Sequence, residues 1–202
     1  MSSVRLVLAS ASPRRVELLR GVGLSFEVIP SGIDETGPLH DPSGFARAAA
    51  RDKGLAVAKR FAAEDHVAVL SADTIVVVDG EIFGKPVDAA DAERMLGRLA
   101  GRTHQVLTGF TLLRAPATIV HEEVVSTAVT FRALGPREVR GYVATGEVSD
   151  KAGAYAAQGF GMFLIERVDG SYSNVVGLPV CEVVQALERH GLASLFPAER
   201  AP

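Results

Sequence analysis

Two adjacent arginines, Arg14 and Arg15, follow an apolar run in the segment "LVLASASPRRVELLRGVG". Ser12 and Pro13 just before them are typical of the start of a helix. Cations are disfavoured at that end of a helix by about 0.3–1 kcal/mol each, because the helix dipole is positive there. A bound phosphate would remove this conflict, since helix N–H groups, arginines and the hydroxyl of Ser10 can all donate to it. The segment predicts an anion site, although a solvated, capped helix would fit it too.

A carboxylate and a lysine interrupt the apolar pattern further along the chain. Asp73 follows the apolar run 66–72, which places it at the end of a predicted strand, where ligands of α/β sheets commonly bind. An aspartate there can act as a general base or hold a divalent cation, whereas a turn aspartate would bond to its own backbone. Lys85, in "GEIFGKP", can supply a point charge to a phosphate or be an ordinary solvated lysine.

A glycine-rich stretch over residues 149–180 contains Gln158. Small residues let a ligand approach the backbone closely, and an amide both donates and accepts hydrogen bonds. Gln158 therefore suits reading the edge of a nucleobase. The alternative is a glycine-rich loop in which the amide only braces a turn.

Strand and helix signals alternate along the chain, and they predict the elements that must position these residues. The apolar runs predict strands at 5–9, 25–30, 66–72 and 74–84, the last a hairpin around Asp79–Gly80, and two antiparallel runs within 103–134. Caps and periodicity predict helices at 13–20, 41–65, 88–102, 135–147 and 177–191. We expect an α/β fold, with a mixed sheet and flanking helices, in one domain over residues 1–202 with a cleft between two lobes.

Composition narrows the classes of protein. The chain has 202 residues, 48% of them hydrophobic, and a formal net charge of −3. It lacks the basic stripe with interleaved aromatics that nucleic acid would require, and no apolar run is long enough to cross a membrane. The single cysteine, Cys181, cannot form an internal disulfide and is expected to be buried. A cytoplasmic protein is the simplest expectation.

Four blocks of the sequence together resemble the Maf family. They are "LASASPRR", "SADTIVVVDGEIFGKP", "DKAGAYAAQGFG" and "GSYSNVVGLP", in family order, and the resemblance runs from about Leu6 to Leu187. It implies a pyrophosphatase that cleaves a nucleoside triphosphate between the α and β phosphates, releasing a monophosphate and pyrophosphate. It also implies an elongated mixed α/β fold with a deep cleft, similar to the inosine-triphosphatase type, and a divalent metal, Mg or Mn.

The resemblance also implies roles for individual residues. Asp73 takes the place of the catalytic proton acceptor, and Glu35 that of an acidic loop residue that helps Asp73 to hold metal. The phosphate-binding positions match Ser10, Arg15, Lys53 and Lys85, and the positions tied to substrate choice match Arg14, Thr74 and Gln158. The glutamine of "AAQG", where "GIQG" is commoner, resembles the branch that prefers dTTP and UTP.

Two alternatives remain open at this point. One is a pyrophosphatase for 7-methyl-GTP or another modified nucleotide, whose branch typically has a glutamate in this block. The other is a non-enzymatic regulator of septum formation in cell division. The expected partners are the nucleoside triphosphate and, as in related proteins, a second copy of the chain in a homodimer; no membrane or nucleic acid is expected.

Overall fold

The computed structural model describes residues 4–33, 40–62, 64 and 66–196. Within this part of the chain, seven strands form one sheet in the order β2–β1–β3–β5–β6–β7, and β4 pairs with β3. Strand β1 is parallel to β2 and β3, and the other pairs are antiparallel. The strands are β1 (Arg5–Leu8), β2 (Glu27–Val28), β3 (Val67–Val78), β4 (Glu81–Phe83), β5 (Thr103–Arg114), β6 (Thr118–Phe131) and β7 (Ile165–Asp169). The mixed α/β class is therefore confirmed.

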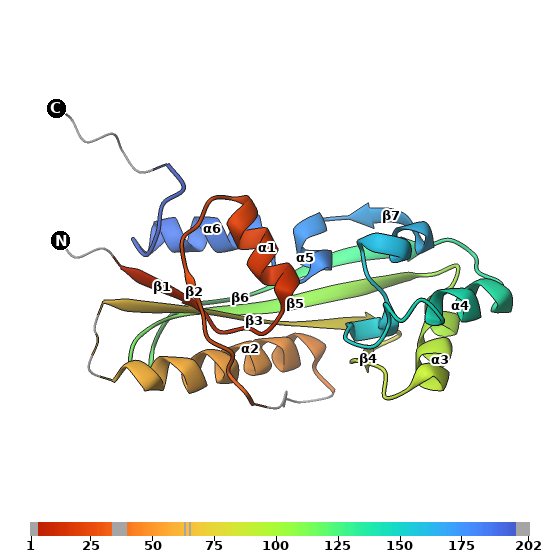
Figure 1. Cartoon of the computed structure of the whole chain (residues 1–202), viewed down its shortest axis with the longest axis horizontal. Helices are drawn as coiled ribbons and strands as arrows, with labels where there is room; N and C mark the ends of the chain where they lie inside the picture. Colours follow the sequence, from red (N-terminus) through yellow and green to blue (C-terminus); the bar gives the residue numbers. More distant parts are fainter. Residues whose placement is uncertain (1–3, 34–39, 63, 65, 197–202) are drawn as a thin grey trace.

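Helices cover both faces of the sheet, and the molecule is elongated (Figure 1). Helix α2 lies along one face, and α1 and α6 lie on the other, while α3 and α4 gather at the far end of the long strands. The helices are α1 (Pro13–Gly21), α2 (Pro42–Ala58), α3 (Ala89–Leu99), α4 (Pro136–Val143), α5 (Tyr172–Val176) and α6 (Val180–Arg189). Short 3-10 helices are η1 (Lys59–Phe61), η2 (Ala152–Ala154) and η3 (Gly159–Leu164).

The apolar core is divided along the length of the sheet. One cluster, which includes Leu70 and Phe110, packs under α1 and α6, and a smaller one packs under α2. A separate cluster, which includes Phe83 and Phe131, fills the end that carries α3 and α4. Each end thus buries its own apolar side chains, at about 1.5–3 kcal/mol apiece. The two-lobed shape expected from the sequence follows from this division.

The strand that carries Asp73 differs from the prediction. Strand β3 is continuous from Val67 to Val78, so Asp73 lies in the middle of a buried strand rather than at its end. The antiparallel partner β5 pairs with β3 over this whole stretch, from Ala68 to Val77. Because the ladder of backbone hydrogen bonds is unbroken, the polar side chain of Asp73 does not mark a turn. The alternative of a turn aspartate is therefore wrong.

Several other elements differ in extent. The predicted strand 25–30 shrinks to β2, because Pro30 cannot donate to a strand ladder. The predicted helix 41–65 ends at Ala58 and continues as η1. Strand β7 and helix α5 were not predicted, since the glycine-rich stretch has no clear period. Cys181 is exposed on α6 and not buried as expected. Among the described residues, none of the helices has the length and apolar character that a bilayer crossing requires.

Candidate active site

A cleft of about 480 Å³ brings together residues from the separate polar segments. Its walls come from the start of α1, the middle of α2 and β3, the segment after β4, and the segments around η2 and α5. Eight of the nine predicted site residues line it: Ser10, Arg14, Arg15, Lys53, Asp73, Thr74, Lys85 and Gln158. The ninth, Glu35, lies outside the described residues. The fold thus brings these eight residues together at one cleft.

Asp73 and Lys53 form a buried ion pair at the base of the cleft. The Lys53 Nζ atom lies 2.5 Å from Asp73 Oδ1, and the two side chains are only 12% and 3% exposed. Gly109 faces Asp73 across the β3–β5 ladder, and a Cβ atom on it would lie 2.3 Å from the carbonyl oxygen of Ala46 in α2. Glycine at this position therefore lets α2 approach the sheet closely enough for Lys53 to reach Asp73.

Arg15 is held by three acceptors from three different segments. Its Nε donates to the carbonyl oxygen of Gly177 (2.8 Å), one Nη to Ser10 Oγ (3.3 Å) and the other to Thr74 Oγ1 (3.1 Å). Thr74 is itself 2.9 Å from Thr108 Oγ1, directly across the β3–β5 ladder. These contacts tie the start of α1 to β3 and to the end of α5. The guanidinium orientation is consequently fixed before any ligand binds.

The N-terminus of α1 forms one wall of the cleft. Pro13 occupies the first turn, and Ser12 occupies the N-cap position without a capping hydrogen bond from its side chain. The first turn contains no acidic residue. Ser10 Oγ instead accepts a hydrogen bond from the Ser12 N–H group at 3.1 Å. Helix N–H groups, a positive dipole end and two arginines therefore face the same space, as an anion site requires.

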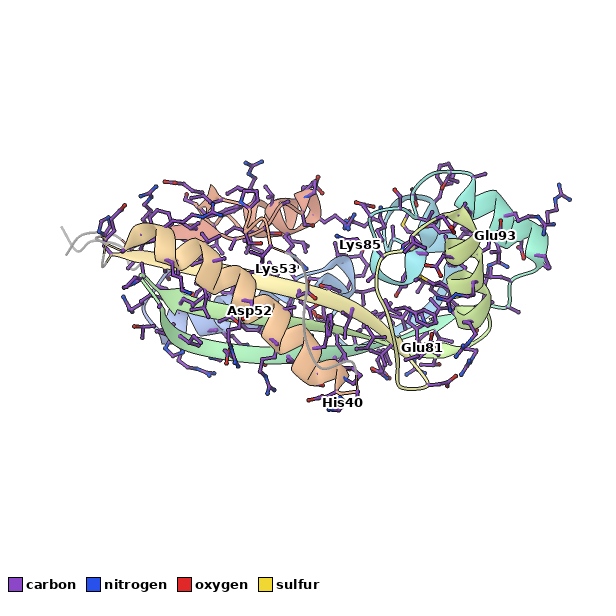
Figure 2. All side chains as sticks on the ribbon, turned by 90° about the horizontal axis from the view of Figure 1, so that it is seen from below. His40, Asp52, Lys53, Glu81, Lys85 and Glu93 are labelled. Atoms are coloured by element: carbon purple, nitrogen blue, oxygen red, sulfur yellow. The ribbon has the colours of Figure 1, made fainter. Side chains whose placement is uncertain are left out.

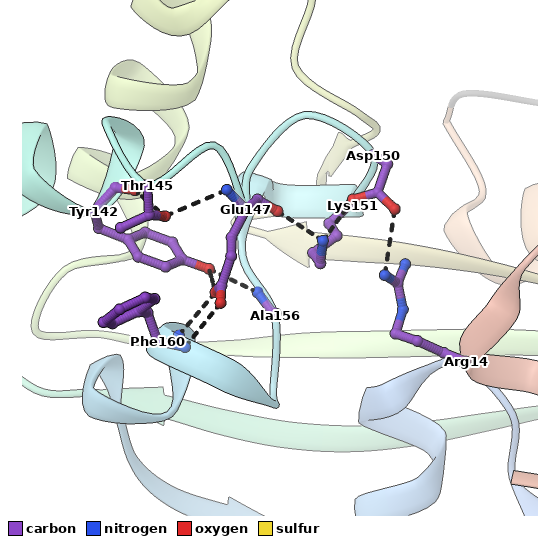
Figure 3. A network of polar contacts seen from close by, with 9 residues as sticks. Arg14, Tyr142, Thr145, Glu147, Asp150, Lys151, Ala156 and Phe160 are labelled. Atoms are coloured by element: carbon purple, nitrogen blue, oxygen red, sulfur yellow. Dashed lines mark hydrogen bonds and ion pairs between the residues drawn. The ribbon is translucent and has the colours of Figure 1, made fainter. Parts of the chain in front are cut away.

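Arg14 connects the α1 wall with the wall opposite (Figure 3). Its Nη1 lies 3.3 Å from Asp150 Oδ2, and the other Asp150 oxygen lies 2.5 Å from Lys151 Nζ. Burial alone would raise the pKa of Asp150. The hydrogen bond from Lys151 and the charges of Lys151 and Arg14 outweigh burial and hold this pKa below its usual range. The Lys151 ammonium also donates to the carbonyl oxygen of Glu147 at 2.7 Å. Asp150 thus bridges two cations across the cleft.

The cleft carries an excess of positive charge. Figure 2 places Lys53 on α2 and Lys85 on the segment that follows β4. With Arg14, Arg15 and Lys151, they make five cationic side chains among the described residues that line the cleft, against the carboxylates of Asp73 and Asp150. The net formal charge of these seven side chains is +3. A polyanion such as a triphosphate suits this balance, because each phosphate oxygen can accept from a cationic donor.

Gln158 lies at the rim, beside the apolar part of the cleft. It is exposed, occupies the position before η3 and, with Arg14, also borders a second cavity of about 360 Å³ next to α1. Tyr155 is buried in the adjoining wall, and burial raises the pKa of its hydroxyl. Apolar side chains that line the same cleft include Phe45 and Ile82. A flat apolar ring with polar edges fits between such walls.

The described residues offer limited means of holding a metal ion. No three His, Cys, Asp or Glu side chains within them are grouped so as to hold one. Magnesium, however, is commonly bound by one or two carboxylates together with substrate phosphates and water. Asp73 fits that requirement, since it lies in the same cleft as the cations that would receive phosphates. When bound with a nucleotide, such an ion would neutralise phosphate charge and polarise a phosphoryl oxygen.

Sequence reasoning overlooked three residues that line the cleft: Asp150, Lys151 and Tyr155. All three belong to the block "DKAGAYAAQGFG", of which only Gln158 was assigned a role. A lysine next to a glycine-rich turn, close to an assigned residue, was the available signal. It was weak because the sequence does not reveal which way a side chain in an irregular segment points.

Fold and site together define a class: a mixed α/β protein with a cationic cleft built around a buried aspartate–lysine pair. The comparison with family models gives the family. The model described as "Maf-like protein" matches residues 5–190, and the chain belongs to the Maf family.

Two relatives match this chain over nearly their full length. A protein of Geobacter sulfurreducens called dTTP/UTP pyrophosphatase is 50% identical over 192 residues, which is 95% of this chain and 99% of the relative. A protein of the same name from Symbiobacterium thermophilum is 50% identical, over 93% of this chain and 94% of the relative. Among solved structures, a HAM1 protein from Coxiella burnetii is 16% identical, with a TM-score of 0.48, over 93% of this chain and 96% of that one. That structural resemblance is distant, and nothing about the site follows from it.

Proposed function

We propose that this protein hydrolyses nucleoside triphosphates between the α and β phosphates and releases a nucleoside monophosphate and pyrophosphate. The observation that carries the proposal is the cleft that contains the Asp73–Lys53 pair together with four further cationic side chains, next to an apolar wall with a glutamine at its rim. The relatives called dTTP/UTP pyrophosphatase, about half identical over nearly the whole chain, support the same activity. The reaction clears unwanted nucleotides from the cellular pool.

Asp73 is the proposed catalytic residue. Its carboxylate orients or deprotonates the water that attacks the α-phosphorus atom. Ser10, Arg15, Lys53 and Lys85 are proposed to bind the phosphate chain, and the overlooked Lys151 joins them from the opposite wall. In phosphoryl-group chemistry of this kind, most of the rate enhancement comes from positioning and from stabilising negative charge. A prearranged guanidinium such as that of Arg15 supplies both.

Arg14, Thr74 and Gln158 are the proposed determinants of substrate choice. Gln158 is exposed at the rim of the cleft, where its amide can both donate to and accept from the edge of a pyrimidine. Thr74 lines the same cleft and accepts a hydrogen bond from Arg15 at 3.1 Å. We therefore infer a preference for dTTP and UTP. No observation favours a modified nucleotide or a non-enzymatic role in septum formation.

A divalent cation, Mg or Mn, is the proposed cofactor, and Asp73 the residue that would hold it. Glu35 stays a predicted metal residue, because it lies outside the described part of the chain. We further propose that residues 1–202 form one domain, since a single sheet draws strands from both ends of the described chain. A cytoplasmic location, a homodimer and the absence of a nucleic-acid partner are carried as proposals on the family resemblance.

Pyrophosphate release by the purified protein tests the function. The panel contains dTTP, UTP, CTP, ATP, inosine triphosphate and 7-methyl-GTP, each with Mg or Mn and with chelator as the control. We expect the fastest release from dTTP and UTP and none in chelator. Asp73→Asn should lower the rate of release by about 10²–10⁴-fold while leaving the circular dichroism spectrum of the folded protein unchanged. Release of pyrophosphate from no member of the panel would refute the proposal, and faster turnover of 7-methyl-GTP would move the protein to the other branch.

A further inference from the structure

Glu147 lies outside the cleft, on the loop that follows α4, yet it contacts the segment that carries Gln158 (Figure 3). Its carboxylate accepts hydrogen bonds from the backbone N–H groups of Phe160 (2.9 Å) and Gly161 (3.1 Å). These are the second and third residues after Gln158. A half-buried carboxylate thus fixes the backbone immediately downstream of the residue at the rim.

The segment upstream of Gln158 is fixed through the same carboxylate. The hydroxyl of Tyr142 donates to Glu147 Oε2 at 3.2 Å and accepts from the Ala156 N–H group at 3.0 Å. Burial is the main cause that raises the pKa of Tyr142, so the hydroxyl keeps the proton that it donates. Glu147 therefore anchors the chain on both sides of Gln158, directly on one side and through Tyr142 on the other.

The glycines around Gln158 show how closely this carboxylate approaches. Gly159 has a φ of +67°, and a Cβ atom on it would lie 2.3 Å from Glu147 Oε1. A Cβ atom on Gly161 would lie 2.1 Å from the carbonyl oxygen of Ala156. The two glycines of "QGFG" are thus required by the close approach of Glu147 and by the tight turn.

The side chain of Gln158, by contrast, has no hydrogen bond to any residue that the structure describes, and it is exposed. Its amide is therefore located by its backbone and not by side-chain partners. On these observations we propose that Glu147 is a positioning residue for substrate choice: it holds the loop so that the Gln158 amide meets a pyrimidine ring. This inference rests on the proposed function and extends it to a residue that does not touch the substrate.

Glu147→Gln is the test variant, because glutamine keeps the size of the side chain and weakens both backbone hydrogen bonds. Glu138→Gln is the matched control. Glu138 also accepts from a backbone N–H group, that of Gly135 at 2.8 Å, but its hydrogen bonds go to Arg132 and Gly135 and not to the loop that carries Gln158. Tyr142→Phe is a second variant that removes the upstream anchor and keeps the aromatic ring. The carbonyl of Glu147, which accepts from Lys151, is present in every variant.

The main measurement is the ratio of kcat/KM for UTP to that for ATP. We expect Glu147→Gln to lower this ratio about tenfold, a change that one lost hydrogen bond to the substrate would produce, and Glu138→Gln to leave it unchanged. Binding of inorganic pyrophosphate, measured as its inhibition constant, should stay within about twofold of the wild type, since phosphate recognition does not involve this loop. Adding Glu147→Gln to Gln158→Ala should lower the ratio no further, because both changes act through the same amide.

Three results would overturn the inference. They are an unchanged ratio in Glu147→Gln and Tyr142→Phe, a proportional loss of pyrophosphate and nucleotide binding, and a wild-type protein that does not distinguish UTP from ATP. The preference for UTP over ATP is also measured as the ratio of Kd values for the non-hydrolysable α,β-imido analogues, a measurement that requires no turnover. A wild type that releases no pyrophosphate but still discriminates between the analogues would refute the proposed function and leave the role of Glu147 to be decided by the binding ratios.

Discussion

Replacing Lys53 by methionine is expected to destabilise the folded protein strongly. The Lys53 ammonium lies 2.5 Å from the Asp73 carboxylate, and side-chain exposures of 12% and 3% leave little water to screen either charge. Removing one member of a buried ion pair costs about 3–5 kcal/mol, because the remaining charge stays in a medium that solvates it poorly. Since whole domains are stable by only about 5–15 kcal/mol, Lys53→Met should remove a large share of the free energy of unfolding.

A double-mutant cycle separates the ion pair from the packing of its side chains. Asp73→Asn should also destabilise, because it leaves the Lys53 ammonium beside a neutral amide. The double variant should lose about 1–3 kcal/mol less than the sum of the two single losses, since it leaves no buried charge behind. Urea unfolding followed by circular dichroism gives these values, and it suits a chain without tryptophan.

Two outcomes would refute this reasoning about Lys53 and Asp73. One is a Lys53→Met variant with the urea midpoint of the wild type, which would mean that water screens the pair. The other is strict additivity in the double variant, which would mean that the two charges do not interact. Pyrophosphate release gives a second measurement on the same variants. In the absence of urea, where the variant is folded, Asp73→Asn should lower kcat by about 10²–10⁴-fold, which is the usual effect of losing a general base.

Three further predictions concern the walls of the cleft and a buried histidine. Arg15→Lys should raise KM for all nucleotides alike, whereas Arg14→Lys should also change the order of the nucleotides by KM. Equal increases in KM across the panel for both variants would contradict this distinction between the two arginines. Lys151→Met should raise KM for every triphosphate by about tenfold without changing the ranking, because a lost charge-assisted hydrogen bond to phosphate does not depend on the base; an unchanged KM would leave Lys151 with a structural role only. Burial lowers the pKa of His104 from 6.5 to about 4. Between pH 6.5 and 4, His104 therefore binds a proton in the unfolded chain but not in the folded protein. The free energy of unfolding should fall by about 3 kcal/mol as the pH drops from 6.5 to 4. His104→Gln should flatten that part of the pH profile measured by urea unfolding, and an identical profile would show that another group causes it.

Much of the fold could be predicted from local signals. The Asp79–Gly80 turn, the Asp41 cap of α2 and the Asp88 cap of α3 all stand where the sequence placed them. These features depend on a few neighbouring residues, whose backbone preferences are strong. Strand β7 and helix α5 escaped prediction because glycines and short polar residues dominate their surroundings. Their structure is set by pairing with β6 and by packing on β5, contacts that are distant in the sequence.

The candidate site, like the fold, was predictable from local signals only in part. The residue types at Arg14, Arg15 and Lys85 are enough to suggest phosphate binding, since they combine cations with a helix start or a turn. Nothing local indicates that Asp73 is buried in mid-strand, because a carboxylate within an apolar run reads more simply as the end of that run. Its burial is tolerated through the ammonium of Lys53, 20 residues away.

The sequence by itself determined the chemistry available to this protein: which side chains carry charge, where helices and turns begin, and which family the four blocks resemble. Only the tertiary structure decided how these side chains are used. Gly109 lets α2 approach the sheet, the carbonyl of Gly177 orients Arg15, and Glu147 fixes the loop that carries Gln158. Each of these contacts joins residues of distant segments, and their geometry depends on the packing of the whole sheet rather than on local preference. The two arginines at the start of α1 thus gain a defined orientation only when the fold is complete.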